Sequence, residues 1–226
     1  MLLRLCRNVT PQRTHSAARL QCLPGDLCRL NLDARAPSAL QHAPWKIVSF
    51  SIYSLTLLAL FTASTLHHGL EGPAALERAL RMADYSAIYA LIAGTFTPIC
   101  LVFLHASGFG WALLGTLWFL ACAGIAMTLI AFDHLPKWLP FTMFITMGWM
   151  GALLVKAIYP MVGLGGVALI AAGGAAYSAG GILYQAEWPQ LVAGRFGFHE
   201  CWHVAVLLGA GLHWCFMWSY VLPFQA

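Results

Sequence analysis

The stretch "GFHECWHVAVLLGAGLHWCFMWSYVL", residues 197–222, decides the fold class. From Val204 to Leu222 the run is almost wholly apolar and contains no Asp, Glu, Lys or Arg. About 20 such residues suffice to carry a helix across the hydrocarbon core of a bilayer. The end of the chain therefore predicts a transmembrane helix whose first turns carry histidines.

The whole chain has the composition of a membrane protein. Of its 226 residues, 60% are hydrophobic and 9% are charged, whereas soluble domains carry about 25% charged residues. A helix satisfies its own backbone hydrogen bonds in lipid, so apolar runs are interpreted as helices. Such runs predict six spans, at 47–68, 84–104, 109–132, 138–159, 161–184 and 199–222. The fifth span is rich in small residues, and we interpret its glycines as packing positions that let helices approach closely. The expected fold is an all-α multi-pass helical bundle in a cell membrane.

The surroundings of the bundle are membrane lipids, which are its only predicted partners. The formal net charge of +4 is modest and gives no support for nucleic-acid binding. No motif identifies a protein partner.

Residues 1–43 differ from the rest of the chain. They hold six of the twelve Lys and Arg residues and no long apolar run. We expect this segment to be poorly ordered and to lie outside the transmembrane domain, which we place at residues 44–226. The loops on one face of the six-span bundle carry Arg78, Arg81, Lys137 and Arg195. The positive-inside rule makes that face cytoplasmic, and the same rule conflicts with an external basic N-terminal segment.

Polar residues gather at one face of the predicted bundle. Ionisable residues at membrane depth are functional candidates. The alternation of spans brings together the end of the first span, the start of the second and the start of the sixth. These ends carry Ser64, His68, Asp84, His199 and His203. Ser64 and His68, like His199 and His203, are four residues apart and share a helix face. Three imidazoles, a carboxylate and a hydroxyl are therefore expected at one depth.

Three His ligands with an open fourth position are the arrangement of a catalytic zinc site. We predict Zn²⁺ bound by His68, His199 and His203 near the cytoplasmic face. Bound zinc lowers the pKa of a water toward about 7, and Asp84 is predicted to hydrogen-bond that water as a base or orienting group. Ser64 is the other catalytic candidate.

Two further histidines are predicted to lie outside this site. His67 points about 100° away from His68 on a helix, and His213 lies about 15 Å along the helix from His203. We expect capping or interfacial roles for both.

Three motifs carry a resemblance to a known family: "ASTLHHGL" (63–70), "MADYSAIYALIAGTFTP" (82–98) and "FGFHECWHVAVLLGAGLHW" (196–214). They resemble the bacterial hemolysin III proteins, which are grouped with the adiponectin and progestin receptors and, more distantly, with the alkaline ceramidases. The resemblance covers roughly residues 44–222. It implies zinc held by three histidines.

Carried over residue by residue, the resemblance implies His68, His199 and His203 as the zinc ligands. Asp84 and Ser64 would lie around the zinc ligands or form hydrogen bonds with the zinc-bound water. In the family the first motif usually reads S-T-L-Y-H, so His67 takes the place of the tyrosine.

The resemblance also implies seven spans, of which six are visible here. The family's first helix has no counterpart before residue 47. We interpret the first 43 residues as a shifted reading of the start of the gene, rather than as the mark of a true six-span variant.

The motif "HECWH" (199–203) also matches H-E-x-x-H, the pattern of zinc metalloproteases. The resemblance favours the family's H-x-x-x-H, in which Glu200 is incidental to the metal. Glu200 lies about 100° around the helix from His199. An intramembrane zinc protease stays an alternative, with Glu200 as base and Asp84 as third ligand.

The sequence leaves three other functions open. The first is a zinc-dependent hydrolase of amide-linked, ceramide-like lipids. The second is a receptor-like or regulatory membrane protein with a structural zinc, and the third is a cytolysin that forms pores. A pore predicts polar stripes along several helices, and these spans are polar mainly at one end. Whether the chain is an enzyme stays open from the sequence.

Overall fold

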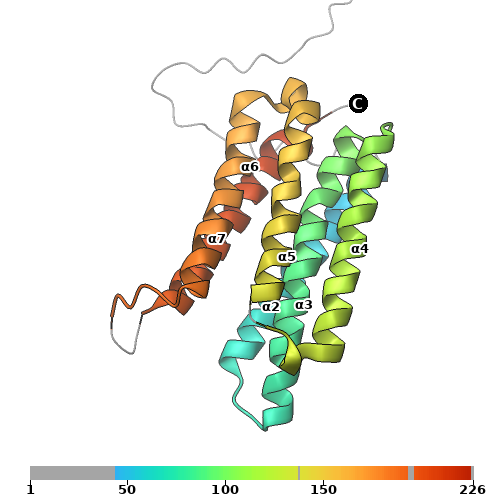
Figure 1. Ribbon diagram of the computed structural model, residues 1–226. Coiled ribbons are helices and arrows are strands. Elements are labelled where there is room, and N and C mark those ends of the chain that lie inside the picture. The colour runs from blue at the N-terminus through green and yellow to red at the C-terminus, as the bar shows by residue number, and fades with distance from the viewer. Residues whose placement is uncertain (1–43, 137, 193–195, 225–226) are drawn as a thin grey trace, which may run out of the picture. The chain divides into compact units, whose positions relative to one another are not determined.

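The computed structural model describes residues 44–136, 138–192 and 196–224, and this part of the chain is helical (Figure 1). The expectations for residues 1–43 lie outside the described residues. The elements are α2 (Pro44–Gly69), α3 (Ala74–Pro98), η1 (Ile99–Phe103), α4 (Gly108–Ala131), η2 (Phe132–His134), α5 (Trp138–Trp149), η3 (Met150–Leu154), α6 (Val155–Gln185), α7 (Phe198–Phe216) and η4 (Met217–Val221). Within these described ranges, five helical segments are long and apolar enough to cross a membrane. The prediction of a multi-pass helical bundle is confirmed.

The longest of these segments, Trp138–Gln185, contains 48 residues. At 1.5 Å per residue it would measure about 72 Å, more than twice the roughly 30 Å hydrocarbon core. The chain reverses at Gly163, whose φ of 60° and ψ of −168° are not helical. Positive φ costs glycine little because it has no Cβ. Figure 1 shows α5 and most of α6 running in opposite directions on either side of this turn. The segment therefore provides two of the predicted spans, which meet close to the turn expected near residue 160.

Helix α3 begins ten residues before the expected position. The prediction of a loop at 69–83, with Asp84 as the first residue of the span, is wrong because the helix begins at Ala74. The stretch "AALERALRM" (74–82) consists of residues that favour helix strongly. Charged residues exclude it from the lipid, but they do not stop a helix from continuing into water. Asp84 therefore lies about 15 Å inside the helix.

Small residues allow the helices to pack closely, as the sequence predicted for 161–184. A Cβ added at Gly180 of α6 would clash with the Cβ of Ala205 on α7. Between α3 and α2, a Cβ at Gly94 would clash with the hydroxyl of Thr56. Close approach of this kind replaces the hydrophobic effect as a source of helix association in lipid.

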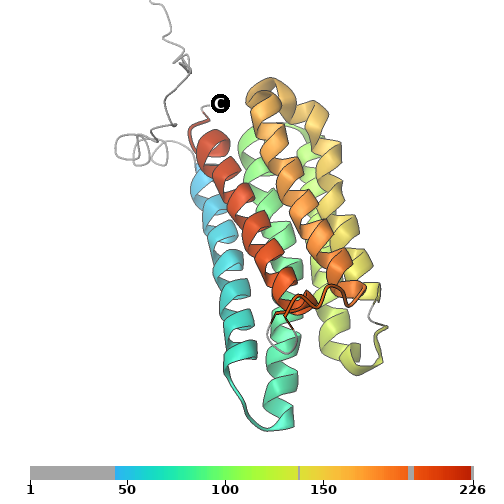
Figure 2. The same cartoon turned by 90° about the vertical axis from the view of Figure 1, so that its left-hand side faces the viewer.

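Helices α2 and α7 are joined near both of their ends, and Figure 2 shows them along the same face of the bundle. At one end, Nζ of the buried Lys46 donates a hydrogen bond of 2.8 Å to the carbonyl oxygen of Leu222 and a second one to that of Phe224. These carbonyls follow the last helical turn, where a cation satisfies acceptors that have no partner inside the helix. At the opposite end, α2 and α7 bring histidines together.

Candidate metal centre

Three histidines from two helices that are distant in the sequence, α2 and α7, converge at one end of the bundle. His68 lies in the last turn of α2, and His199 and His203 lie in the first two turns of α7. Nε2 of His199 is 3.4 Å from Nε2 of His68 and 3.0 Å from Nε2 of His203. One ligand atom from each residue lies within 4.8 Å of the others. We call His68, His199 and His203 the three-histidine group.

The spacing of these nitrogens suits a metal ion better than a set of hydrogen bonds. Two nitrogens bound to one tetrahedral zinc at about 2.05 Å lie about 3.3 Å apart, close to the observed 3.0 and 3.4 Å. In a neutral imidazole, each ring nitrogen carries either one proton or one lone pair. Nε2 of His199 can therefore form a good hydrogen bond with one of the two neighbouring Nε2 atoms but not with both. A cation bound by all three nitrogens removes this conflict.

Asp84 and Ser64 lie beside the three-histidine group, as the sequence predicted. Asp84 is half-buried on α3, and one of its carboxylate oxygens lies within 4.8 Å of candidate ligand atoms of His67 and His68. Ser64 precedes His68 by one helical turn, and both line the same cavity as Asp84. The three predicted helix ends thus meet at one depth, although Asp84 does not begin its helix.

The cavity has a volume of about 660 Å³ and is lined by residues of α2, α3, α5, η3, α6 and α7. Its lining on α3 runs from Asp84 to Phe96, a distance of about 18 Å along the helix. Beyond the histidine end the lining is mainly aliphatic and aromatic, with Ile88, Leu91, Phe144 and Val206 among its residues. The site is therefore a polar group of side chains at one end of this long, mainly apolar cavity.

Glycine at one lining position of α6 helps to keep this cavity open. The sequence interpretation assigned packing to the glycines of α6, which is correct for Gly173 and Gly180. Gly174 lines the cavity instead, and a Cβ placed on it would meet nothing within 4 Å. Periodicity could not separate the two roles, because both require a small residue.

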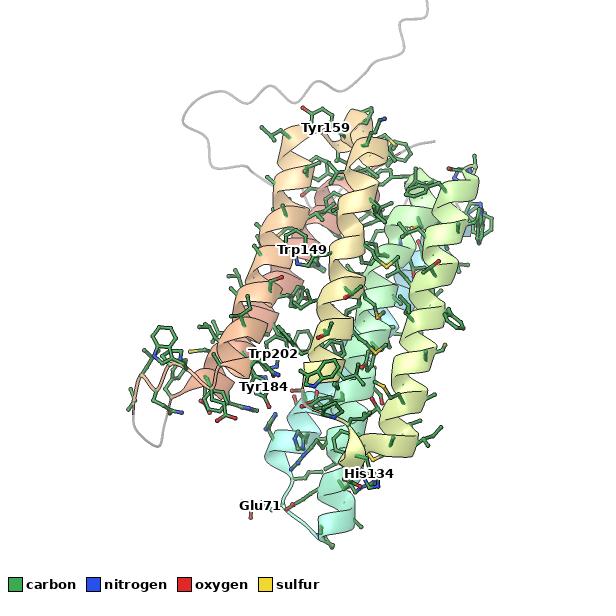
Figure 3. All side chains as sticks on the ribbon, viewed as in Figure 1. Glu71, His134, Trp149, Tyr159, Tyr184 and Trp202 are labelled. Atoms are coloured by element: carbon green, nitrogen blue, oxygen red, sulfur yellow. The ribbon has the colours of Figure 1, made fainter. Side chains whose placement is uncertain are left out.

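Tyr184 of α6 packs against the start of α7 beside the three-histidine group. Its ring centroid lies 5.7 Å from that of His199 and 6.0 Å from that of Trp202. Figure 3 labels Tyr184 and Trp202 at the same end of the bundle, with Tyr159 at the other. No motif pointed to Tyr184, which lies in a small-residue helix that the sequence analysis treated only as packing.

Glu200 has a structural partner. Its Oε2 accepts a hydrogen bond of 2.7 Å from the backbone N–H of Gly197, which precedes α7. A Glu at the third helical position commonly satisfies a free N–H at the start of a helix in this way. This contact gives the Glu of "HECWH" a role that needs no metal, and it agrees with the expectation that Glu200 is incidental to the site.

The two histidines that were set aside behave differently from each other. His213 contributes Nε2 to a 3.3 Å contact with the carbonyl oxygen of Ile170, between α7 and α6. It belongs to neither candidate metal group of the described residues. His67 is absent from the three-histidine group, but it shares a second group with His68 and Asp84. The helical angle alone did not predict this, because α3 approaches His67 from another direction.

Comparison with known proteins places this geometry in a family. A family model described as "Haemolysin-III related" matches residues 14–214, a range that contains the three-histidine group, Asp84 and Ser64. This chain belongs to the haemolysin-III-related family. It is 34% identical to Hemolysin-3 of Bacillus cereus over 177 residues, which cover 78% of this chain and 77% of that protein.

Other relatives of this haemolysin-III-related protein extend the match. A hemolysin-3 homolog of Bacillus subtilis (strain 168) is 33% identical over 213 residues, or 93% of each chain. The human monocyte to macrophage differentiation factor is 27% identical over 184 residues, covering 78% of this chain and 72% of that protein. The family match begins at residue 14, before the range 44–222 over which the sequence motifs indicated the resemblance. The family and the apolar helices together make the chain a multi-pass integral membrane protein.

Proposed function

We propose that this haemolysin-III-related protein is a zinc-dependent membrane hydrolase whose substrates are lipids with an amide-linked acyl chain. The observation that carries the proposal is the position of the three-histidine group, which lies with a carboxylate and a hydroxyl at one end of a long apolar cavity. His68, His199 and His203 would hold the ion. Zinc in such a site polarises a carbonyl and makes water more acidic near neutral pH.

The residues around the ion divide the remaining tasks. The apolar lining suits an acyl chain, because burying each CH₂ contributes about 0.8 kcal/mol. A chain inserted along α3 places its polar linkage at the histidine end, next to Asp84. The Asp84 carboxylate can accept a proton from an attacking water, and the Ser64 hydroxyl can donate a hydrogen bond to an oxygen of the substrate.

The other candidate functions have less support. The cavity lining is mainly apolar away from the histidine end, which does not suit a water-filled pore. A zinc protease needs the carboxylate of Glu200 as a base, yet this carboxylate is hydrogen-bonded to the start of α7. A receptor-like protein with a structural zinc is compatible with the same ligands and is the alternative that the following experiment separates.

The experiment starts with the metal content of protein purified into lipid nanodiscs. We expect about one tightly bound zinc per chain. A screen of N-acyl lipids should then reveal turnover that a chelator abolishes and added zinc restores. Bound zinc without turnover of any lipid amide would support the receptor-like alternative, and absence of bound zinc would overturn the metal centre itself.

A leucine at Gly174 tests whether the acyl chain occupies the cavity. Because Gly174 faces open space inside it, we expect Gly174→Leu to raise KM for a long-chain substrate by about 10-fold, the worth of one or two methylene contacts. Zinc content and turnover of a short-chain analogue should change little. Gly115→Leu is the matched control, since Gly115 also has nothing within 4 Å but lies on the outer face of α4. Equal effects of the two variants would exclude the cavity as the acyl site.

A further inference from the structure

A second group of metal-ligating side chains lies next to the three-histidine group. His67, His68 and Asp84 each offer one ligand atom, and these atoms lie within 4.8 Å of one another. The rings of His67 and His68 have centroids 4.6 Å apart with planes inclined at 48°. The group comes from the end of α2 and the third turn of α3, so it involves neither residue that α7 contributes to the first group.

One ring nitrogen of His67 lacks a partner. Nδ1 of His67 is buried, and the described residues offer it no hydrogen bond. A buried polar atom without a partner is destabilising, so its retention calls for an explanation. A metal ion bound at this nitrogen provides one.

The donor set has the chemistry of a transition-metal site. Two imidazoles and a carboxylate are the protein ligands of several catalytic zinc sites. His68 can belong to both groups because an imidazole has two ring nitrogens. Its Nε2 is the atom that lies 3.4 Å from Nε2 of His199, which leaves Nδ1 for the second group.

We propose that His67, His68 and Asp84 form a second, weaker site for a divalent transition metal such as zinc. It is weaker than the first because His68 is shared and because two dications repel each other at short distance. The second ion engages the Asp84 carboxylate. If the proposed hydrolase function holds, on which this consequence rests, zinc in excess of one equivalent inhibits turnover by occupying the base.

Metal titration of the nanodisc-embedded protein tests the second site without reference to activity. Titration of the metal-free protein with Zn²⁺ should show two classes of site, one tight and one weak. Losing an outer partner of a metal site costs about 10–100-fold in affinity. We therefore expect His67→Phe, which keeps an aromatic ring but loses a direct ligand, to weaken the weak class about 100-fold or more while the tight class stays.

Two controls exclude adventitious binding. His134→Phe removes an exposed histidine that belongs to neither group of the described residues and should leave both classes unchanged. Co²⁺ bound in the weak class should show d–d bands without a thiolate charge-transfer band, because the proposed ligands are nitrogen and oxygen. A thiolate band would assign the weak class to a cysteine and overturn the proposal.

The remaining outcomes are distinct from failure of the hydrolase proposal. A single class of zinc-binding site in the wild type would mean that the two groups are alternative positions of one ion. The proposal of a second site would then be wrong. A weak class of unchanged affinity in His67→Phe would likewise overturn the proposal. Two classes with no lipid-amide turnover would leave the second site standing and remove only the proposed function.

Discussion

Replacing Asp84 with Asn is expected to leave the tight zinc in place and to lower hydrolysis by about 100-fold or more, within the usual range for loss of a general base. Asp84 is not a member of the three-histidine group, so the direct ligands of the tight ion are untouched. An amide cannot accept a proton as a carboxylate can. The measurement is zinc content and turnover of the same sample, at zinc concentrations that fill only the first site.

Glu200→Gln is the matched control for Asp84→Asn, since it makes the same chemical change on a carboxylate beside the histidines. An amide oxygen can still accept the hydrogen bond from the N–H of Gly197, so we expect turnover within about threefold of wild type, a change of well under 1 kcal/mol. A zinc protease predicts the reverse. In that case Glu200→Gln would be inactive, and Asp84→Asn would have lost the tight zinc.

Alanine at any member of the three-histidine group should remove most of the tightly bound zinc. Each substitution leaves two protein ligands, whereas catalytic zinc sites retain three. Loss of an outer partner already costs about 10–100-fold in affinity, so loss of a direct ligand should cost at least the upper end of that range. Metal analysis after exhaustive dialysis of His68→Ala, His199→Ala and His203→Ala measures the effect.

Two histidines outside the three-histidine group serve as controls for these variants. His213→Ala and His67→Ala should retain the tight zinc, because neither belongs to the three-histidine group. His213→Ala is expected to lower thermal stability instead, since the ring packs against Gly173 on α6. Equal losses of tight zinc in His67→Ala and His68→Ala would show that the wrong one of the two adjacent histidines had been chosen.

The sequence predicted the placement of the site well because two simple periodicities determine it. The alternation of spans places helix ends on one face or the other, and a spacing of four residues places His199 and His203 on one side of α7. Both signals are local or nearly so. The convergence of His68, His199 and His203 therefore followed from counting spans, and the structure places them together.

What the sequence did not predict depends on contacts between elements. The start of α3 was missed because the membrane boundary was taken as the helix boundary, although the residues of "AALERALRM" favour helix in water as well. The cavity was missed because a glycine that leaves space and a glycine that allows packing look alike in a sequence. His67 was set aside from its angle on α2 alone, while its position next to Asp84 depends on how α3 crosses.

The long separation of the histidines along the chain has a consequence for biogenesis. His68 and His199 are 131 residues apart, so the site has no local precursor. Chains are made from the N-terminus, and early segments adopt structure before later ones exist. His68 and Asp84 enter the bilayer while α7 is still unsynthesised, so an ion held by the three-histidine group would not meet its full ligand set until α7 is inserted. Because binding free energy becomes folding free energy when a site forms late, such an ion would act as a checkpoint on completed insertion. A truncated chain that lacks α7 would never pass it.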